Sequence, residues 1–291
     1  MGLASLAQIA ADGLLLGLVY ALVAAGLSLI FGLMDIVNFA HGELMMLAMF
    51  ATWVAWRATG LDPLVLLFLI PILAFLVGVG LYYGLIARAL AVPVNRAMVQ
   101  VFVTFGLGIF LRGAAQFVFG SDFKSITHSW LGDHAWRMGA ISLPQAELAA
   151  GIVALIAFAL LLLVSRTEFG RALEATREDR EAVALIGIDR DRIFALGWGL
   201  GTAAVGVAGV MLAGFYYISP DVGANFAIIA YVAVSLGGFG SLPGALIAGI
   251  IVGEAESFTA AFFDPALKQV GYYAIFLLVL MIRPRGLFGK I

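Results

Sequence analysis

The chain consists of long apolar runs separated by short segments that carry the charged and polar residues. Eight runs contain no Asp, Glu, Lys or Arg, namely 13–34, 44–56, 63–87, 97–111, 148–165, 193–220, 222–253 and 269–282. The run 222–253 exceeds the roughly 20 residues that one helix needs to cross a bilayer. Because the turn-forming sequence GGFGSLPG interrupts it at 237–244, we expect two helices there.

These runs predict helices and not barrel strands, because they lack the two-residue alternation of a membrane strand. We therefore expect an all-α, polytopic membrane protein with about eight to ten transmembrane or re-entrant helices. Residues 1–291 would form a single transmembrane domain. A loop at 120–147 would lie on one side of the membrane, and a charged segment at 166–192 on the other.

Composition supports this class and excludes several others. Of the 291 residues, 63% are hydrophobic and 12% are charged, whereas about a quarter of a soluble domain is charged. The mean hydropathy of +1.09 rules out a soluble enzyme. Without cysteine the chain cannot form disulfides or thiolate metal sites, and its net charge of −2 argues against a nucleic-acid partner.

The distribution of basic residues predicts which side of the membrane each loop faces. Six Arg lie within 166–192, and further basic residues follow the third and the last apolar runs (Arg88, Arg96, Arg283, Arg285 and Lys290). By the positive-inside rule these segments, and with them the C-terminus, belong in the cytoplasm. Aromatic residues at the opposite ends of the runs fit an outer interfacial belt (Trp53, Trp56, Tyr216, Tyr217, Tyr272 and Tyr273). The side of the N-terminus depends on whether 35–43 crosses the membrane or re-enters it.

Two copies of the tripeptide Asn-Phe-Ala suggest an internal two-fold repeat. They stand at 38–40 and 225–227, each after an apolar run and a nearby Asp, and each opens a further apolar stretch. Transporters are often built from repeated halves, with broken helices near the membrane midplane. The alternative is coincidence, and superposition of 9–90 on 195–280 would distinguish the two.

The segment DIVNFAHGELMML (35–47) places four polar side chains in an apolar setting: Asp35, Asn38, His41 and Glu43. Ionisable residues at membrane depth usually face a cavity or a partner, so one interpretation is a segment that lines a translocation path. The other is a helix start at the interface, capped by Asp35 or Asn38. The spacing from His41 to Glu43 does not match a zinc motif, and we expect no metal site.

Three further charges fall near the expected outer ends of their runs. Arg112 lies in TFGLGIFLRGAAQFVFG, where snorkelling of the side chain to the interface is the expected behaviour. Glu254 and Glu256 end their run near the outer face, and we expect them to contact water. None of the three is expected to have a catalytic role.

The segment 166–192 holds 13 of the 34 charged residues. Within it, TREDREAVALIG predicts a short helix over 177–186, with Thr176 as the N-cap and Gly187 at the C′ position. Ala182, Leu185 and Ile186 form an apolar stripe on this helix. The stripe either folds back onto the bundle or docks a cytoplasmic partner. The sequence contains no GxxxxGK[ST] motif, so any ATPase that drives transport is another polypeptide.

Several segments together resemble the LivH-type permeases of branched-chain amino acid ABC importers. They are GLSLIFGLMDIVNFAHGELMML (26–47), VPVNRAMVQVFVTFGLGIFL (92–111), GRALEATREDREAVALIGIDRDRIFAL (170–196), GGFGSLPGALIAGIIVG (237–253) and RPRGLFG (283–289). The resemblance covers nearly the whole chain, in the order and spacing of the family. It is fairly specific for the family but not for the cargo, because similar permeases serve urea, amides or other amino acids.

The resemblance implies a bacterial inner-membrane permease that is surrounded by lipid and paired with a second, homologous permease subunit. Two cytoplasmic ABC ATPases would use ATP, this chain would bind no cofactor, and a periplasmic binding protein would deliver the solute to the outer loop, where Trp130 and Trp136 lie. Residues 171–187 would be the segment that couples to the ATPase, namely Arg171, Glu174, Arg177, Arg180, Glu181, Ala182, Leu185, Ile186 and Gly187. Within this segment, Glu181, Ala182 and Gly187 match the core of the coupling signature of ABC importers. Their spacing departs from the longer form of the signature in other ABC importers.

Asn38, His41, Glu43 and Asn225 are the candidates for lining the translocation path. An alternative function is secondary transport driven by an ion gradient, with Asp35, His41 and Glu43 as the ion relay. An intramembrane hydrolase is disfavoured, because the serines of the apolar runs have no obvious histidine partner in the sequence.

Overall fold

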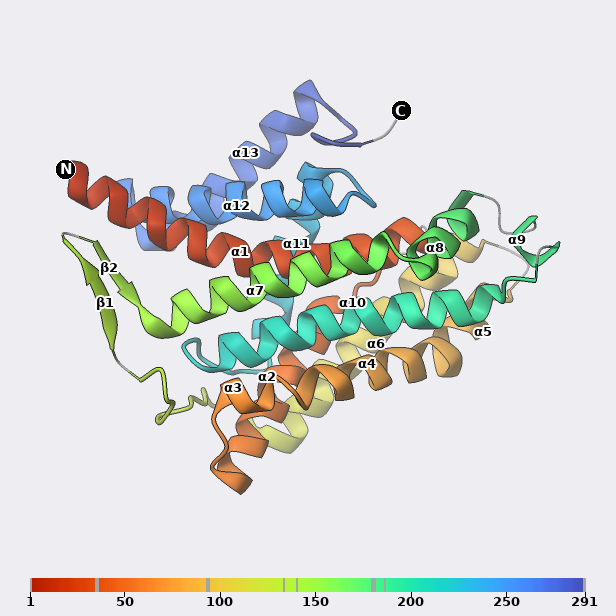
Figure 1. Ribbon diagram of the computed structural model, residues 1–291, viewed down its shortest axis with the longest axis horizontal. Helices are drawn as coiled ribbons and strands as arrows, with labels where there is room; N and C mark the ends of the chain where they lie inside the picture. Colours follow the sequence, from red (N-terminus) through yellow and green to blue (C-terminus); the bar gives the residue numbers. More distant parts are fainter. Residues whose placement is uncertain are drawn as a thin grey trace.

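The computed structural model describes residues 2–34, 37–92, 95–132, 134–139, 141–178, 182–185 and 187–289. Long helices run side by side through most of it (Figure 1). They are α1 (Leu3–Met34), α2 (His41–Thr59), α6 (Arg96–Phe119), α7 (Gln145–Ser165), α10 (Arg190–Ala213), α11 (Val222–Gly237), α12 (Leu242–Phe262) and α13 (Lys268–Ile282). One further crossing, Pro63–Leu90, is assembled from α3 (Pro63–Leu66), α4 (Ile70–Leu81), a π-helical turn η1 (Tyr82–Ile86) and α5 (Ala87–Leu90).

Each apolar run of the sequence is a helix in the structure, and the run 222–253 is divided as expected. Its break falls at Gly238 and Gly240, whose φ angles of 98° and 77° favour glycine. Within the described residues, seven helices are long and apolar enough to span a membrane, while α11 is shorter. The chain is therefore a polytopic helical membrane protein.

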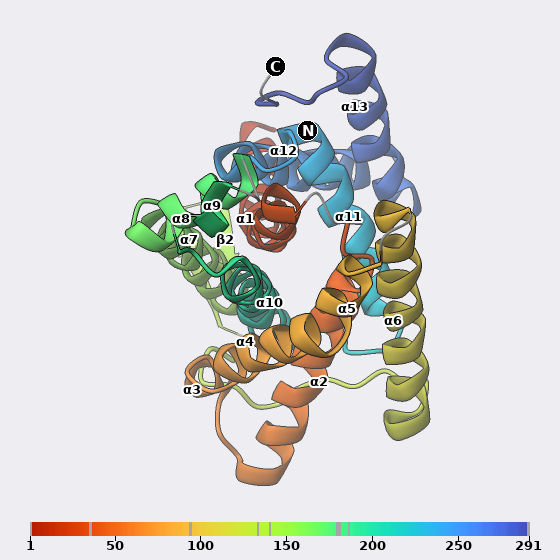
Figure 2. The same ribbon diagram turned by 90° about the vertical axis from the view of Figure 1, so that its right-hand side faces the viewer.

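Helix α1 occupies the middle of the bundle and packs along α12, α10, α7 and α11 (Figure 2). Glycines allow the closest approaches. A Cβ on Gly253 would collide with the backbone of Gly13 and Gly17, so two GxxxG pairs form the contact between α1 and α12. Gly26 of α1 and Gly201 of α10 meet in the same way, each against the carbonyl of the other.

The two segments that the sequence suggests as repeats, 9–90 and 195–280, begin with helices that run in opposite directions, as in an inverted repeat. Helix α1 lies along α12, and α10 lies along α4, while α1 and α10 run antiparallel (Figure 1). The two Asn-Phe-Ala motifs are not equivalent in this arrangement. Asn38 precedes the first residue of α2 by three positions, whereas Asn225 follows the first residue of α11 by three.

A β-hairpin that the sequence did not suggest lies at one end of the bundle. Strands β1 (Ala135–Met138) and β2 (Ile141–Pro144) pair antiparallel, with Trp136 opposite Leu143. The N-terminus lies beside it, because the amide of Gln8 exchanges two hydrogen bonds with the backbone of Ser142, of 2.7 and 2.8 Å. We call this the hairpin end of the bundle. Helix α1 therefore crosses the whole bundle from here.

The opposite end, which we call the α8 end, carries the short helices α8 (Glu168–Glu178) and α9 (Ala182–Leu185). The C-terminal tail folds back to this end. The N–H groups of Leu287 and Phe288 donate to the carbonyls of Leu236 and Gly237, at 2.8 and 3.0 Å. The tail thereby covers the turn between α11 and α12.

Candidate functional site

Helix α8 is amphipathic and lies against the ends of α1, α7 and α10. Its buried positions are Gly170, Leu173 and Thr176, at the three-residue spacing of one helix face. The prediction that Thr176 caps a helix is wrong, because its hydroxyl donates to the carbonyl of Ala172 inside α8. The helix begins nine residues earlier than expected, since Leu173 supplies the apolar contact that anchors its first turns on the bundle.

Beyond α8 the chain makes one short turn of helix and stops. Gly187 has a φ of 82°, and the N–H of Ile188 donates to the carbonyl of Val183, which is the hydrogen bond of a Schellman motif. The prediction of Gly187 as the C′ residue is thus confirmed. Val183 is buried, whereas the side chain of Leu185 is 89% exposed. Part of α9 therefore packs inward, and Leu185 projects from the α8 end.

The remaining residues of the expected coupling segment fall into three groups. Arg171 is exposed and forms a loose pair with Glu168, at 3.8 Å. Glu174 and Arg177 line a cavity beneath α8. Arg180, Glu181 and Ile186 lie outside the described residues, and Ala182 is the first residue of α9.

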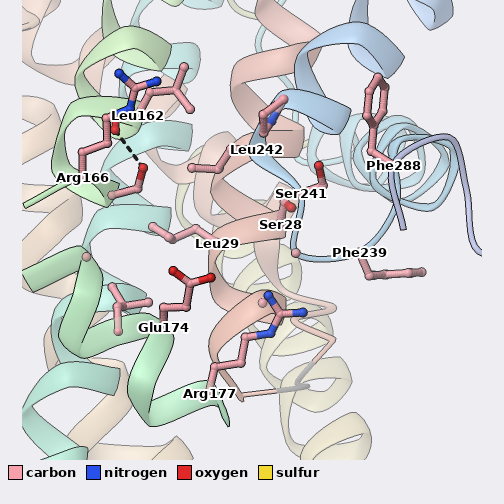
Figure 3. Close-up of a pocket in the computed structure, with 16 residues that line it drawn as sticks. Ser28, Leu29, Leu162, Arg166, Glu174, Arg177, Phe239, Ser241, Leu242 and Phe288 are labelled. Carbon is pink, nitrogen blue, oxygen red and sulfur yellow. Dashed lines mark hydrogen bonds between the residues drawn. The ribbon is translucent and has the colours of Figure 1, made fainter. Parts of the chain in front are cut away.

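The cavity has a volume of about 450 Å³ and lies between α1, the end of α7, α8, the start of α12 and the C-terminal tail (Figure 3). Four of the sequence segments that carry the family resemblance contribute to its walls. They supply Ser28, Leu29 and Gly32 from α1, Gly170, Leu173, Glu174 and Arg177 from α8, Phe239, Gly240, Ser241, Leu242 and Pro243 from the turn before α12 and its first residues, and Phe288 from the tail. The sequence alone could not reveal that these distant segments converge.

A second polar cluster lies inside the bundle, where α2 begins. The ring of His41 bonds through Nε2 to the carbonyl of Val23, at 3.0 Å. Val23 precedes the end of α1 by eleven residues, or roughly 16 Å. The chain therefore returns into the bundle before α2 starts, and the interpretation of 35–47 as a helix start at the interface is wrong. Asp35 lies outside the described residues.

Three side chains satisfy the backbone of the irregular segment 37–40. The side-chain oxygen of Asn38 accepts from the N–H of Ala40, at 3.1 Å. The carbonyl of Asn38 accepts from the hydroxyl of Tyr231 in α11, at 2.6 Å, and the carbonyl of Val37 from that of Thr104 in α6, at 3.1 Å. This arrangement allows non-helical backbone at membrane depth.

Glu43 and Arg112 form an ion pair between α2 and α6. Nη2 and Nε of Arg112 both donate to Oε1 of Glu43, at 2.7 and 3.2 Å. Glu43 is 3% exposed, and the side chain of Arg112 is 37% exposed. The expectation that Arg112 snorkels to the interface is thus wrong. This ion pair could have been predicted, because charged residues at membrane depth usually pair with one another and Glu43 also lies in an apolar run.

Helix α11 begins against this pair. A Cβ on Gly223 would collide with the carboxylate of Glu43, and one on Gly42 with the carbonyl of Gly223. Oε2 of Glu43 has no hydrogen-bond partner among the described residues and lies beside the first turn of α11. Asn38, His41 and Glu43 thus all lie at the buried start of α2, but His41 bonds to α1 and Glu43 to α6, whereas Asn225 is exposed on α11.

A third buried charge cluster was missed. From the sequence we expected Glu256 to contact water, but it is 5% exposed. It accepts a hydrogen bond from the hydroxyl of Tyr20, at 2.7 Å, and pairs with Lys268, at 2.8 Å. The expectation is wrong because the partners come from α1 and the start of α13, far away in sequence. Glu254 is partly buried, with one carboxylate oxygen enclosed beside Gly13.

Comparison with known proteins places the chain in a family. The family described as "Branched-chain amino acid transport system / permease component" matches residues 9–280. A similar protein is the high-affinity branched-chain amino acid transport system permease protein LivH of Salmonella typhimurium, with 32% identity over 96% of this chain and 94% of that protein. The permease protein BraD of Pseudomonas aeruginosa has the same identity and coverage.

A more distant relative is the probable branched-chain amino acid transport permease protein LivH of Methanocaldococcus jannaschii, with 27% identity over 92% of this chain and 88% of that protein. No solved structure matches this chain. The family match covers almost all of the helical bundle described above, including α8 and the irregular start of α2. The chain therefore belongs to the family of permease components of branched-chain amino acid transport systems.

Proposed function

We propose that this chain is the membrane-spanning subunit of an ABC importer and couples to a cytoplasmic ATPase through α8 and α9. The observation that carries the proposal is the exposed side chain of Leu185, held on α9 by the turn at Gly187. An apolar side chain that projects from a charged segment is suited to a groove on a partner. The absence of a P-loop motif from the sequence requires that the ATPase be a separate polypeptide.

The packing of α8 offers a route from the ATPase to the translocation path. Leu173 anchors α8 against the bundle, and α8 contacts both α1 and α10. These two helices meet at Gly26 and Gly201, next to the ring of His41. Movement of α8 on ATP binding would shift α1 against α10 and open the junction of α2 and α11 alternately to each side. Asn38, His41 and Glu43 would line the path there, with Asn225 on the exposed face of α11.

We propose the remaining partners from the family resemblance. In a bacterial inner membrane the α8 end and the C-terminus would face the cytoplasm, and the hairpin end the periplasm. A solute-binding protein would contact the hairpin end, where Trp130 and Trp136 are exposed. A second, related permease subunit would complete the pathway. The names of the relatives make branched-chain amino acids the leading cargo.

The test is ATP-driven uptake of leucine in proteoliposomes that contain the assembled importer. Arg177→Glu reverses a charge on α8, and Gly187→Pro removes the left-handed turn; both should abolish uptake and leave membrane insertion unchanged. Arg88→Glu is the matched control, since it makes the same charge change at an exposed position on α5, outside α8 and α9. Unchanged uptake in either α8-end variant would contradict the coupling role.

Secondary transport is the second candidate, and it is favoured by the buried Glu43, one oxygen of which has no partner among the described residues. A carboxylate in that position can carry a proton or a cation across a membrane. Vesicles that contain this chain without any ATPase distinguish the two functions. Accumulation of leucine driven by a proton or sodium gradient alone would support secondary transport and would contradict the ABC assignment.

A further inference from the structure

The cavity beneath α8 contains a buried polar group for which the described residues provide no partner. The side chain of Ser28 is 1% exposed, and its hydroxyl makes no hydrogen bond within the part of the chain that the structure describes. A buried hydroxyl without a partner is costly, so a ligand that bonds to it gains affinity. Figure 3 shows Ser28 next to Ser241, which caps the N-terminus of α12. The positive end of the dipole of this 21-residue helix faces the same place.

Three charged side chains complete the polar lining, namely Arg177, Glu174 and Arg166, which directly follows α7. Arg177 lies in the last turn of α8, and its Nη2 would be 3.4 Å from a Cβ on Gly240. Glu174 lies one turn earlier on the same face, and its carboxylate points into the cavity below Leu29 (Figure 3). The cavity thus has a positive region near Ser28 and Ser241, a negative region at Glu174, and a further positive charge at Arg166.

The hydroxyl of Ser165 donates to the carbonyl of Leu162 within α7, and the rest of the lining is apolar. Leu29, Leu173 and Leu242 come from α1, α8 and α12, and all three border the same space. The volume of about 450 Å³ falls within the range of small-molecule sites, which is roughly 300–1,000 Å³. A ligand that matches these walls has an anionic group, a cationic group close to it, and an aliphatic side chain.

We propose that this cavity binds a zwitterionic α-amino acid with an aliphatic side chain, taken up from the α8 end. Its carboxylate bonds to Arg177, Ser28 and the start of α12, its ammonium group bonds to Glu174, and its side chain contacts the three leucines. The identity of the ligand and the effect of binding rest on the proposed function. A bound amino acid links α8 to α1 and α12, opposes the movement of α8, and so lets imported product slow its own transport.

Binding is measured by calorimetry on the purified full chain, with leucine, 4-methylpentanoate, which lacks the ammonium group, and 3-methylbutylamine, which lacks the carboxylate. Arg177→Gln should weaken leucine binding about tenfold, because a charge-assisted hydrogen bond is lost. Arg171→Gln is the matched control on α8, since Arg171 does not line the cavity, and it should leave binding unchanged. Glu174→Gln should weaken the binding of leucine but not that of 4-methylpentanoate.

Three results would overturn the proposal: no binding of leucine to the unmodified chain, equal binding to the Arg177→Gln and Arg171→Gln variants, or equal effects of Glu174→Gln on leucine and on 4-methylpentanoate. A lipid headgroup is the alternative occupant of the cavity. To test it, leucine binding is measured with the chain in nanodiscs of phosphatidylcholine, with and without phosphatidylglycerol. If phosphatidylglycerol displaces leucine in proportion to its content and binds in its absence, the site is a lipid site and the proposal fails.

The regulatory effect is measured as the ratio of uptake with and without leucine trapped inside proteoliposomes that contain the importer. In the unmodified importer this ratio should fall below one. In Leu242→Trp, which fills the cavity, it should return to one, and a ratio unaffected by this change would overturn the regulatory role. If the importer takes up no leucine even when none is trapped inside, only the proposed function is contradicted. Binding of leucine to the cavity is measured by calorimetry on the isolated chain, which requires no transport.

Discussion

The ion pair between Glu43 and Arg112 predicts an asymmetric response to the loss of its two charges. Glu43 is 3% exposed, whereas the side chain of Arg112 is 37% exposed. In Arg112→Gln, a buried carboxylate remains without its cation. In Glu43→Gln, the guanidinium that remains is partly solvated and can still donate to the amide oxygen. Removal of the more exposed partner should therefore be the more harmful change.

The magnitudes follow from the burial of the two groups. Breaking a fully buried pair costs about 3–5 kcal/mol. The partial exposure of Arg112 admits solvent near the carboxylate, so we expect about 2–3 kcal/mol for Arg112→Gln. For Glu43→Gln we expect about 1 kcal/mol. The double variant should resemble Glu43→Gln and be more stable than Arg112→Gln, since it leaves no uncompensated buried charge.

Thermal unfolding of the purified chain in detergent measures these differences, with tryptophan fluorescence as the signal. For a chain of this length about 1 kcal/mol corresponds to roughly 2 °C, so Arg112→Gln should lower the midpoint by roughly 4–6 °C and Glu43→Gln by roughly 2 °C. Arg57→Gln, an exposed change on α2, should cost no more than about 0.5 kcal/mol. Equal losses in the two single variants, or additive losses in the double variant, would refute this reasoning.

Three further predictions concern packing, a buried hydrogen bond and topology. Gly42→Ala should destabilise the chain by about 1–3 kcal/mol, because the new Cβ meets the backbone of α11, whereas Gly106→Ala adds a methyl group in open space and should stabilise α6 by roughly 0.5–1 kcal/mol. Tyr20→Phe should lower the free energy of unfolding by about 1–2 kcal/mol, because it removes a hydrogen bond to the buried carboxylate of Glu256. Thermal unfolding measures this loss and the effects of the two glycine substitutions. Since the chain has no cysteine, Ser5→Cys and Leu185→Cys report topology directly: a membrane-impermeant maleimide should label them from opposite sides, and labelling from the same side would contradict the crossing of α1.

The features that the sequence predicted correctly depend on local or composition-based physics. The apolar runs had to be helices, because a bilayer leaves no other way to satisfy the backbone of a single segment. The turn at Gly187 could be placed because glycine at the end of a short helix favours the left-handed conformation. The break between α11 and α12 could be placed on the same grounds.

The features that the sequence missed depend on partners far away along the chain. Glu256 was assigned to water because its neighbours in sequence gave no reason to bury it; Tyr20 and Lys268 give that reason only in the folded chain. Arg112 is a similar case, since 69 residues separate it from Glu43. The cavity beneath α8 could not be predicted at all, because no single segment supplies more than part of its walls.

The irregular segment 37–40 also has a consequence for the order of assembly. Its carbonyl groups accept hydrogen bonds from Thr104 and Tyr231, which lie 67 and 193 residues later in the chain than their acceptors. When α1 and α2 first enter the bilayer, neither donor has been synthesised. The hydrogen bonds of this segment are therefore complete only after α11 has been inserted. The N-terminal half of this membrane protein remains unfinished until nearly the whole polypeptide has left the ribosome.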